Sequence, residues 1–106
     1  MKLRVHPEVD DEVKDAVQSL NAQQPSAGDR FFVEYQKHLQ RIQDDPWSLP
    51  KLETAPRRLD IRRTLIRRFH YLVIFEMLSD DEVLLLGVAH GNRRSNYWLK
   101  RRSTKL

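Results

Sequence analysis

The segment that decides the fold runs from residue 59 to residue 98 and reads LDIRRTLIRRF (59–69), HYLVIFEML (70–78), SDDE (79–82), VLLLGVAH (83–90) and GNRRSNYW (91–98). Residues 71–78 and 83–90 are apolar at almost every position apart from Glu76, which is typical of strands inside a sheet. The polar residues between these two strands predict a hairpin connection. Gly87 indicates a bulge or a close approach of backbone. Together with residues 58–68, the segment predicts three consecutive strands.

The first half of the chain predicts a short strand followed by two amphipathic helices. Residues 2–6 alternate polar and apolar, and Pro7 suits the first position of a helix that runs to about residue 20. Ser26 resembles the N-cap of a second helix that ends near residue 43, before Asp45-Pro46.

The order β-α-α-β-β-β predicts an α+β fold, in which a helical hairpin packs on one face of a mainly antiparallel sheet of about four strands. The length of 106 residues fits a single domain over 1–106. We expect the other side of the sheet to remain available to a large partner.

Two connecting segments are given structural roles by their composition. Residues 45–56 hold three of the five prolines and predict an extended connection, with Trp47 and Leu49 closing the edge of the core. After Gly91, Ser95 is placed to cap a final short helix that contains Tyr97 and Trp98. The acidic residues at 8–12 fit the positive end of the first helix dipole, so they are not interpreted as a metal site.

Composition excludes several classes of function. The chain has no cysteine, which excludes disulfides, thiolate catalysis and cysteine-ligated zinc and fits a cytoplasmic location. The four histidines are far apart, and neither a glycine-rich phosphate loop nor a nucleophile motif occurs, so we expect no metal, cofactor or small-molecule substrate. The start of the chain does not resemble a secretory signal, and no apolar run is long enough to span a membrane.

Charge is distributed unevenly along the chain. Residues 1–50 hold six Lys/Arg and nine Asp/Glu, a net charge of −3, whereas residues 51–106 hold thirteen and six, a net charge of +7. A basic half that also forms the sheet indicates binding of a polyanion or an acidic protein. The alternative is a soluble surface with arginine-rich strand edges.

Basic and aromatic residues form the candidate site. Arginine forks match phosphate oxygens, and aromatic rings stack on bases. The candidate target- or nucleic-acid-binding residues are Arg58, Arg62, Arg63, Arg67, Arg68, Arg94 and Trp98. If the protein cleaves RNA, His90 or Tyr97 would transfer protons and Arg93 would stabilise charge on the phosphorus. The alternatives are a core role for Trp98, a hydrogen bond at the strand end for His90 and ion pairs for the arginines.

Nearly the whole sequence resembles the RelE/ParE superfamily of bacterial toxins from type II toxin–antitoxin modules. The resemblance is carried by VHPEVDDEV (5–13), GDRFFVEY (28–35), RRTLIRRFHYLVIFEM (62–77) and VAHGNRRSNYW (88–98). His90, Arg93, Tyr97 and Trp98 fall on the family's strand-four ending. The stretch RRFHYLVIFEM (67–77) looks closer to the ParE, or plasmid-stabilisation, pattern, and Tyr71 stands where the nuclease branch often has arginine.

The resemblance implies the same βααβββ fold and a cognate antitoxin that neutralises the toxin. A ParE-like member implies DNA gyrase as the target and arrest of growth. The alternatives are a ribosome-dependent mRNA endoribonuclease, as in the RelE branch, and a degenerate member without toxicity.

Overall fold

The computed structural model describes residues 1–91, 93 and 96–103, and its elements follow the predicted order. They are β1 (Lys2–Val5), α1 (Pro7–Gln23), α2 (Ala27–Asp44), the 3₁₀ turn η1 (Pro46–Ser48), β2 (Ile61–Ile66), η2 (Arg67–Phe69), β3 (Tyr71–Ser79), β4 (Glu82–His90) and η3 (Leu99–Ser103). The strands form one sheet in the order β1-β4-β3-β2. Only β1, which pairs with β4, is parallel to its neighbour. The predicted α+β fold with a mainly antiparallel sheet is therefore confirmed.

The strand β2 is shorter than the predicted 58–68. It ends at Ile66 because the next three residues form η2, and His70 then takes a left-handed conformation with φ of 59°. This turn reverses the chain into β3, which pairs antiparallel with β2 from Ile66↔Tyr71 to Ile61↔Glu76. The arginines at 67 and 68 consequently lie on a turn at one end of the sheet.

The helix α1 starts where Pro7 predicts and runs three residues beyond position 20. The buried His6 occupies the N-cap, and its Nδ1 accepts a hydrogen bond of 3.2 Å from the backbone N–H of Glu8. This bond satisfies one of the N–H groups that a helix start leaves unpaired.

The start of α2 differs from the prediction in one detail. Ser26 is the N-cap residue, but it has a φ of 68° and its side chain makes no capping hydrogen bond with the described residues. The Asn21 Oδ1 atom instead accepts a hydrogen bond of 2.7 Å from the backbone N–H of Gly28. A Cβ at Gly28 would lie 2.1 Å from the carbonyl oxygen of Val17, so the two helices approach each other closely here.

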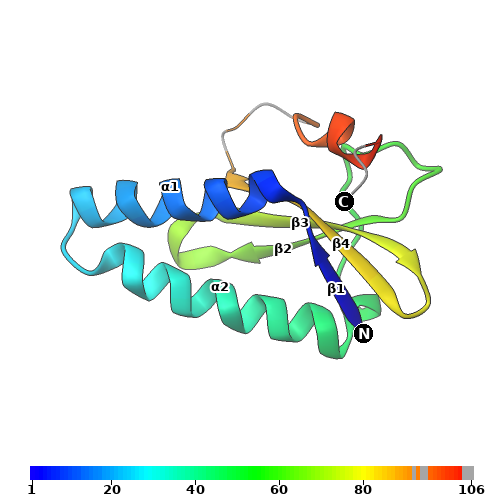
Figure 1. Cartoon of the computed structure of the whole chain (residues 1–106), viewed down its shortest axis with the longest axis horizontal. Coiled ribbons are helices and arrows are strands. Elements are labelled where there is room, and N and C mark those ends of the chain that lie inside the picture. The colour runs from blue at the N-terminus through cyan, green and yellow to red at the C-terminus, as the bar shows by residue number, and fades with distance from the viewer. Residues whose placement is uncertain (92, 94–95, 104–106) are drawn as a thin grey trace.

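Both faces of the sheet are covered. The helical hairpin lies along one face, as expected, and packs on a cluster that includes Val73, Phe75, Val83 and Leu85 (Figure 1). On the second face, Ile61, Ile74, Leu84 and Leu86 pack with Trp98 and with partly buried side chains from residues 52–59 and 97–99. The expectation of a second face left available to a partner is therefore wrong for this part of the sheet.

The prediction for Gly87 is confirmed. The register of β3 and β4 shifts between Ile74↔Gly87 and Phe75↔Leu85, which leaves Leu86 as the extra residue of a bulge. Because of this bulge, Val88 joins the cluster beneath the helices although it lies three residues after Leu85. A Cβ at Gly87 would lie 2.5 Å from the Tyr97 hydroxyl, so the groups that approach the strand here are side chains and not backbone.

The predicted connections are partly corrected. Leu49 is buried as expected, but Trp47 is 47% exposed and does not close the core, because its ring packs against the Arg62 guanidinium, 5.4 Å from the ring centroid. Tyr97 and Trp98 precede η3 rather than lying in it, and the predicted cap Ser95 lies outside the described residues. No described helix is long and apolar enough to cross a membrane.

Replacing Gly28 with alanine tests the close approach of the helices. Alanine favours helices by about 1 kcal/mol over glycine, but its Cβ would collide with backbone atoms of α1. We expect Gly28→Ala to lower the free energy of unfolding by about 2 kcal/mol, as overpacking does, measured by urea denaturation. Gln36→Ala, on the exposed side of α2, is the control and should change it little. A stabilised Gly28→Ala variant would contradict the close contact.

Candidate functional site

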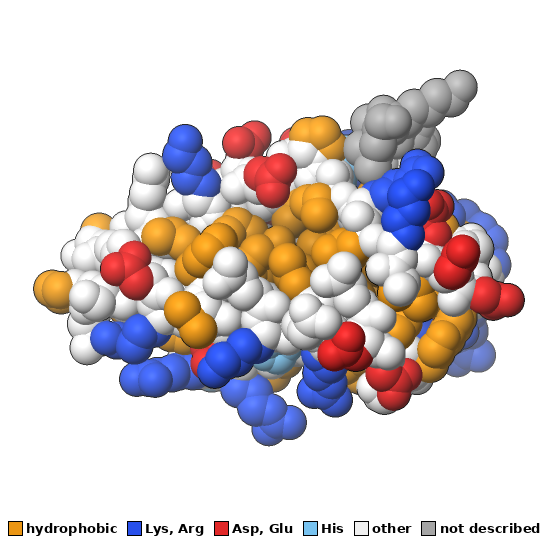
Figure 2. Space-filling model, turned by 60° about the horizontal axis from the view of Figure 1, so that its bottom comes forward, with side chains coloured by type: hydrophobic (Ala, Val, Ile, Leu, Met, Phe, Trp, Pro, Cys, Tyr) orange, Lys and Arg blue, Asp and Glu red, His pale blue; other side chains and the backbone are white. Residues whose placement is uncertain are grey.

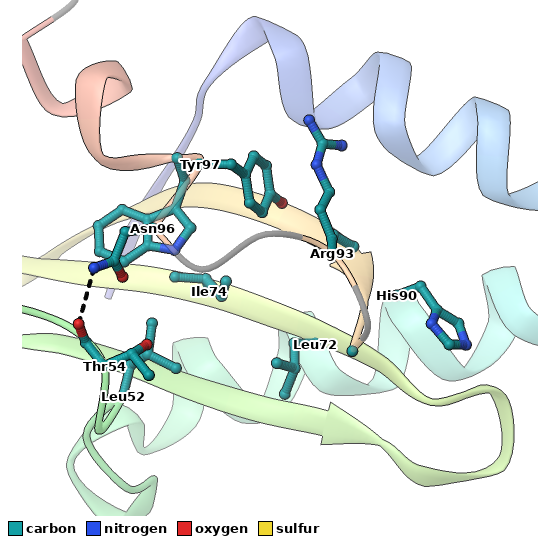
Figure 3. Close-up of a pocket in the computed structure, with 11 residues that line it drawn as sticks. Leu52, Thr54, Leu72, Ile74, His90, Arg93, Asn96 and Tyr97 are labelled. Carbon is teal, nitrogen blue, oxygen red and sulfur yellow. Dashed lines mark hydrogen bonds between the residues drawn. The ribbon is translucent and has the colours of Figure 1, made fainter.

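A cavity of about 190 Å³ lies between the second face of the sheet and residues 96–98. Leu52, Leu72 and Ile74 form much of its apolar wall. Its polar lining includes Arg93, Asn96 and Tyr97, and Figure 3 shows Asn96 and Tyr97 above the strands of the sheet. Asn96 has a φ of 61°, and its Nδ2 donates a hydrogen bond of 2.9 Å to the carbonyl of Thr54, which ties the two covering segments together.

Arg93 and Tyr97, two of the predicted catalytic residues, are in contact. The Arg93 guanidinium carbon lies 3.8 Å from the Tyr97 ring centroid, a cation–π arrangement. The same guanidinium forms an ion pair of 3.1 Å with Glu12 of α1. Figure 3 accordingly shows the Arg93 side chain directed toward α1 rather than down into the cavity.

Tyr97 is held in its neutral form. Burial raises the pKa of Tyr97, and the nearby carboxylate of Glu12 raises it further, by more than Arg101 and Arg93 lower it. The buried hydroxyl oxygen has no hydrogen-bond partner among the described residues. It packs over Gly87, so Tyr97 acts as a packing residue whose hydroxyl lies near the carboxylate of Glu12.

His90, the third predicted catalytic residue, ends β4 and lies on the rim of the cavity. Its ring meets that of Tyr71 edge to face, with centroids 5.6 Å apart, and lies 6.4 Å from the ring of His70. In Figure 3 the His90 ring points away from Tyr97 and Arg93. The structure therefore brings Arg93 and Tyr97 together, whereas the ring of His90 lies beside the rings of Tyr71 and His70.

A buried arginine missed by the sequence analysis organises this region. Arg101 of η3 is 4% exposed, and its Nη1 donates to Glu12 Oε1 at 2.9 Å and to the Leu86 carbonyl at 2.8 Å. Its Nε also lies 3.2 Å from a carboxylate oxygen of Glu8. Burial alone would lower the pKa of Arg101, but the hydrogen bond and charge of Glu12 raise it, so the guanidinium stays charged.

Arg101 and Glu12 complete the edge of β4. Pairing with β1 ends at Val5↔Leu85, and beyond it no described strand lies beside β4 on the side away from β3. The Leu86 carbonyl accepts from Arg101, and the Val88 N–H donates to Glu12 Oε1 at 3.0 Å. Two side chains thus replace the missing strand, which satisfies the polar groups that an edge exposes.

A second ion pair fastens η3 to the sheet. Arg102 donates from Nε and Nη2 to the two carboxylate oxygens of Glu76, at 2.8 and 2.7 Å. Glu76 was the one charged residue within an apolar strand, and a buried carboxylate of this kind indicates that a cationic partner lies elsewhere in the chain. The hydrogen bonds to Glu76 raise the pKa of Arg102.

The remaining predicted binding residues do not gather at one place. Arg62 donates to Asp60 Oδ1 and to the Leu49 carbonyl, at 2.9 and 2.8 Å, and so holds the connection before β2. Arg63 faces Glu53 at 3.8 Å. Trp98, 1% exposed, is a core residue of the second face. Arg58, Arg67 and Arg68 are exposed, and Arg94 lies outside the described residues.

A larger groove lies elsewhere, between the two helices. It has a volume of about 670 Å³ and an apolar floor that includes Val13, Val17 and Leu39. Phe32, 41% exposed, forms part of its wall, and Asp10, Lys14 and Asp29 lie at its margins. Figure 2 shows hydrophobic side chains gathered across this face of the molecule. We call this feature the helix groove.

Among the described residues, no group of three or more His, Cys, Asp or Glu side chains is arranged to hold a metal ion. The carboxylates that approach one another, Glu8 and Glu12, are bound by Arg101. Glu12 therefore does not only complement the helix dipole, because it also pairs across the fold with Arg101.

Comparison with known proteins identifies one family. Residues 3–95 match the family model described as "ParE toxin of type II toxin-antitoxin system, parDE". The match includes His90 and Arg93 and ends before Tyr97, Arg101 and Arg102. No curated protein matches the chain.

Replacing Arg101 tests whether it holds the covering segment in place. Arg101→Met leaves the carboxylate of Glu12 in a site that is largely buried, so we expect the free energy of unfolding to fall by about 3 kcal/mol in urea denaturation. The matched control is Arg93→Met, which removes a more exposed partner of the same carboxylate and should cost less than about 1 kcal/mol. Equal losses in the two variants would contradict the structural role of Arg101.

Proposed function

The chain belongs to the ParE toxin family of type II toxin–antitoxin systems, and on this premise we propose that it is a toxin that binds and inhibits DNA gyrase. The family match makes the protein the toxin component of such a module, and its partner is an antitoxin. A toxin that inhibits gyrase acts in the cytoplasm and arrests growth, so we propose this location and outcome as well.

The observation that carries the proposal is the way Arg93 and Tyr97 are held. General acid–base catalysis needs a group whose pKa lies near the working pH, whereas the pKa of Tyr97 is raised and its hydroxyl packs over Gly87. Arg93 is bound to Glu12, and the ring of His90 is directed elsewhere (Figure 3). These contacts support a structural use of the residues and favour a toxin that acts by binding.

An RNA-cleaving toxin is the second candidate, and one observation favours it. Arg93 and Tyr97 are in contact, and together with His90 they line one cavity on the second face of the sheet. Arg93 is also exposed, so its guanidinium could reach a phosphate if it left Glu12. A family member without toxicity is the third candidate, and the assays described below separate all three.

We place the antitoxin in the helix groove. A partner that inserts an amphipathic segment between α1 and α2 would cover Val17, Phe32 and Leu39, which the toxin alone leaves partly accessible to solvent. The lining of the groove includes Asp10 and Lys14 of α1 and Asp29 of α2, whose charges can fix the register of a charged partner. The second face is less suitable, because residues 52–59 and 97–99 already cover it.

The target is tested with the purified protein in two assays. We expect it to inhibit supercoiling by purified gyrase, with the antitoxin reversing the inhibition, and to leave transcripts intact in a translating ribosome extract. Tyr97→Phe removes only a buried oxygen without a described partner, so it should inhibit gyrase as strongly as the unaltered protein.

Other outcomes of these assays would contradict the proposal. Cleavage of ribosome-bound mRNA without effect on gyrase would establish the endoribonuclease, and Arg93→Ala should then slow cleavage by about 10²- to 10³-fold. No effect in either assay, together with no growth arrest on expression, would indicate the non-toxic alternative.

The antitoxin site is tested by changing neighbouring residues of α2. Phe32→Asp places a charge in the helix groove, and we expect it to weaken binding of the antitoxin encoded beside the toxin by about 100-fold, since buried aromatic anchors contribute 2 kcal/mol or more. Val33→Asp is the matched control, because Val33 is 50% exposed but does not line the groove. Calorimetry measures the affinities, and equal effects of the two substitutions would exclude the groove.

A further inference from the structure

A row of cations follows the outer side of α2. Arg30, Lys37 and Arg41 are separated by seven and four residues, and at 3.6 residues per turn they lie within about 40° of one another around the helix. All three are exposed. The rise of ~1.5 Å per residue separates Arg30 from Arg41 by ~16 Å along the helix axis.

The packing of α2 on the sheet adds two arginines to this row. Phe31 packs edge to face on Phe69, with ring centroids 5.6 Å apart, which brings η2 beside the N-terminal half of α2. Arg67 and Arg68 directly precede Phe69 in η2 and are exposed.

Farther along α2, the Nδ1 atom of His38 lies 2.6 Å from Thr64 Oγ1 of β2, so the helix also follows this edge strand. The boundary between α2 and the β2–η2 segment therefore carries a set of five cations. We call this set the cation seam: Arg30, Lys37, Arg41, Arg67 and Arg68.

Most charges of the cation seam are not neutralised within the protein. Lys37 lies 3.3 Å from Glu34, and both side chains are largely exposed, so the pair is weak. The four arginines of the seam form no ion pair with the described residues. Arg93, Arg101 and Arg102, in contrast, are each bound to a carboxylate. Figure 2 shows Lys and Arg side chains along the lower edge of the molecule, beneath the apolar band.

We propose that the cation seam binds the phosphate backbone of duplex DNA without reading its sequence. Duplex DNA carries one negative charge per ~1.7 Å of helix axis, so a row of ~16 Å runs beside several phosphates of one strand. Guanidinium groups match phosphate oxygens bidentately, and contacts of this kind position a protein on a duplex without specifying bases. The seam thus gives the toxin a second surface, which would contact the DNA held by gyrase. Only this biological role rests on the proposed function.

The surroundings of the seam favour a duplex over other polyanions. Single-stranded nucleic acid is bound by stacking on exposed aromatic rings. Of the exposed Phe and Trp rings among the described residues, that of Phe32 lines the helix groove, and the Arg62 guanidinium already packs against that of Trp47. A protein partner needs an apolar centre for its interface, and the helix groove supplies one on another side of α2. What the seam offers is a straight, rigid row of cations.

The experiment measures binding of a fluorescent 20-base-pair duplex of arbitrary sequence over a range of salt concentrations, by anisotropy. Five phosphate contacts predict that log K falls with log[salt] with a slope of about −4.5. Arg30→Gln/Arg41→Gln should lower the magnitude of the slope by about 2 and weaken binding roughly tenfold or more at low salt. Arg67→Gln/Arg68→Gln should act similarly, and Glu34→Gln should strengthen binding because it removes the acidic residue within the row.

The matched control removes two charges from other parts of the surface. Lys2→Gln/Arg57→Gln changes the exposed Lys2 on β1, at the opposite edge of the sheet, and the exposed Arg57 in the connection before β2. It should alter the affinity for DNA much less than the seam variants do. Equal effects of the seam variants and the control would show that the protein binds DNA by general charge attraction, which would overturn the proposal. Unfolding curves of every variant confirm that these exposed substitutions leave the fold intact.

Two further outcomes would also overturn the assignment. A single-stranded RNA of the same length that binds more tightly, with the same dependence on the seam, would identify a single-strand surface. Seam variants that lose antitoxin affinity but keep DNA affinity would identify an acidic protein as the occupant. Since the DNA measurement contains no gyrase, it fails or succeeds independently of the supercoiling assay.

Discussion

The burial of β3 and β4 on both faces is the constraint on which the rest of the structure depends. Alternate residues of an extended strand point to opposite sides, so apolar residues at nearly every position require a cover on each side of the sheet. The helical hairpin covers one face, over Val73 and Phe75, and Trp98 with its neighbours covers the other, over Ile74 and Leu86. Residues 97–99 are therefore part of the core.

This second cover has to be fastened, because η3 is short and has little packing of its own. Arg101 and Arg102 bind Glu12 and Glu76, which belong to α1 and to β3, so the last described turn is tied to two elements at once. The Glu12 carboxylate also accepts hydrogen bonds from the Arg93 guanidinium and from the backbone N–H of Val88. One carboxylate thus organises the edge of β4 and the residues that the family resemblance associates with RNA cleavage.

The sequence was sufficient to predict the two central strands and the hairpin of helices, since their apolar residues recur at periods of two and of about 3.6. The same two-sided apolarity already required a second cover, but nothing local identified it. Arg101 pairs with Glu12 across 89 residues, and an arginine in a polar C-terminal segment carries no signal of burial. For the candidate site, His90, Arg93 and Tyr97 were predicted as one catalytic set, and the fold brings only Arg93 and Tyr97 into contact. The orientation of His90 depends on rings that only the folded sheet brings together.

The three sides of α2 show how so small a domain can serve more than one partner. One side, with Phe31, Tyr35 and Ile42, is buried against the sheet and fixes the helix in place. A second side places Phe32 and Leu39 in the helix groove, where an apolar segment of an antitoxin can gain binding energy from burial. The third side carries the cation seam, where electrostatic attraction acts without apolar contact. Because these sides point in different directions, an antitoxin that fills the groove need not cover the seam, and neutralisation of the toxin can leave its attraction for polyanions in place.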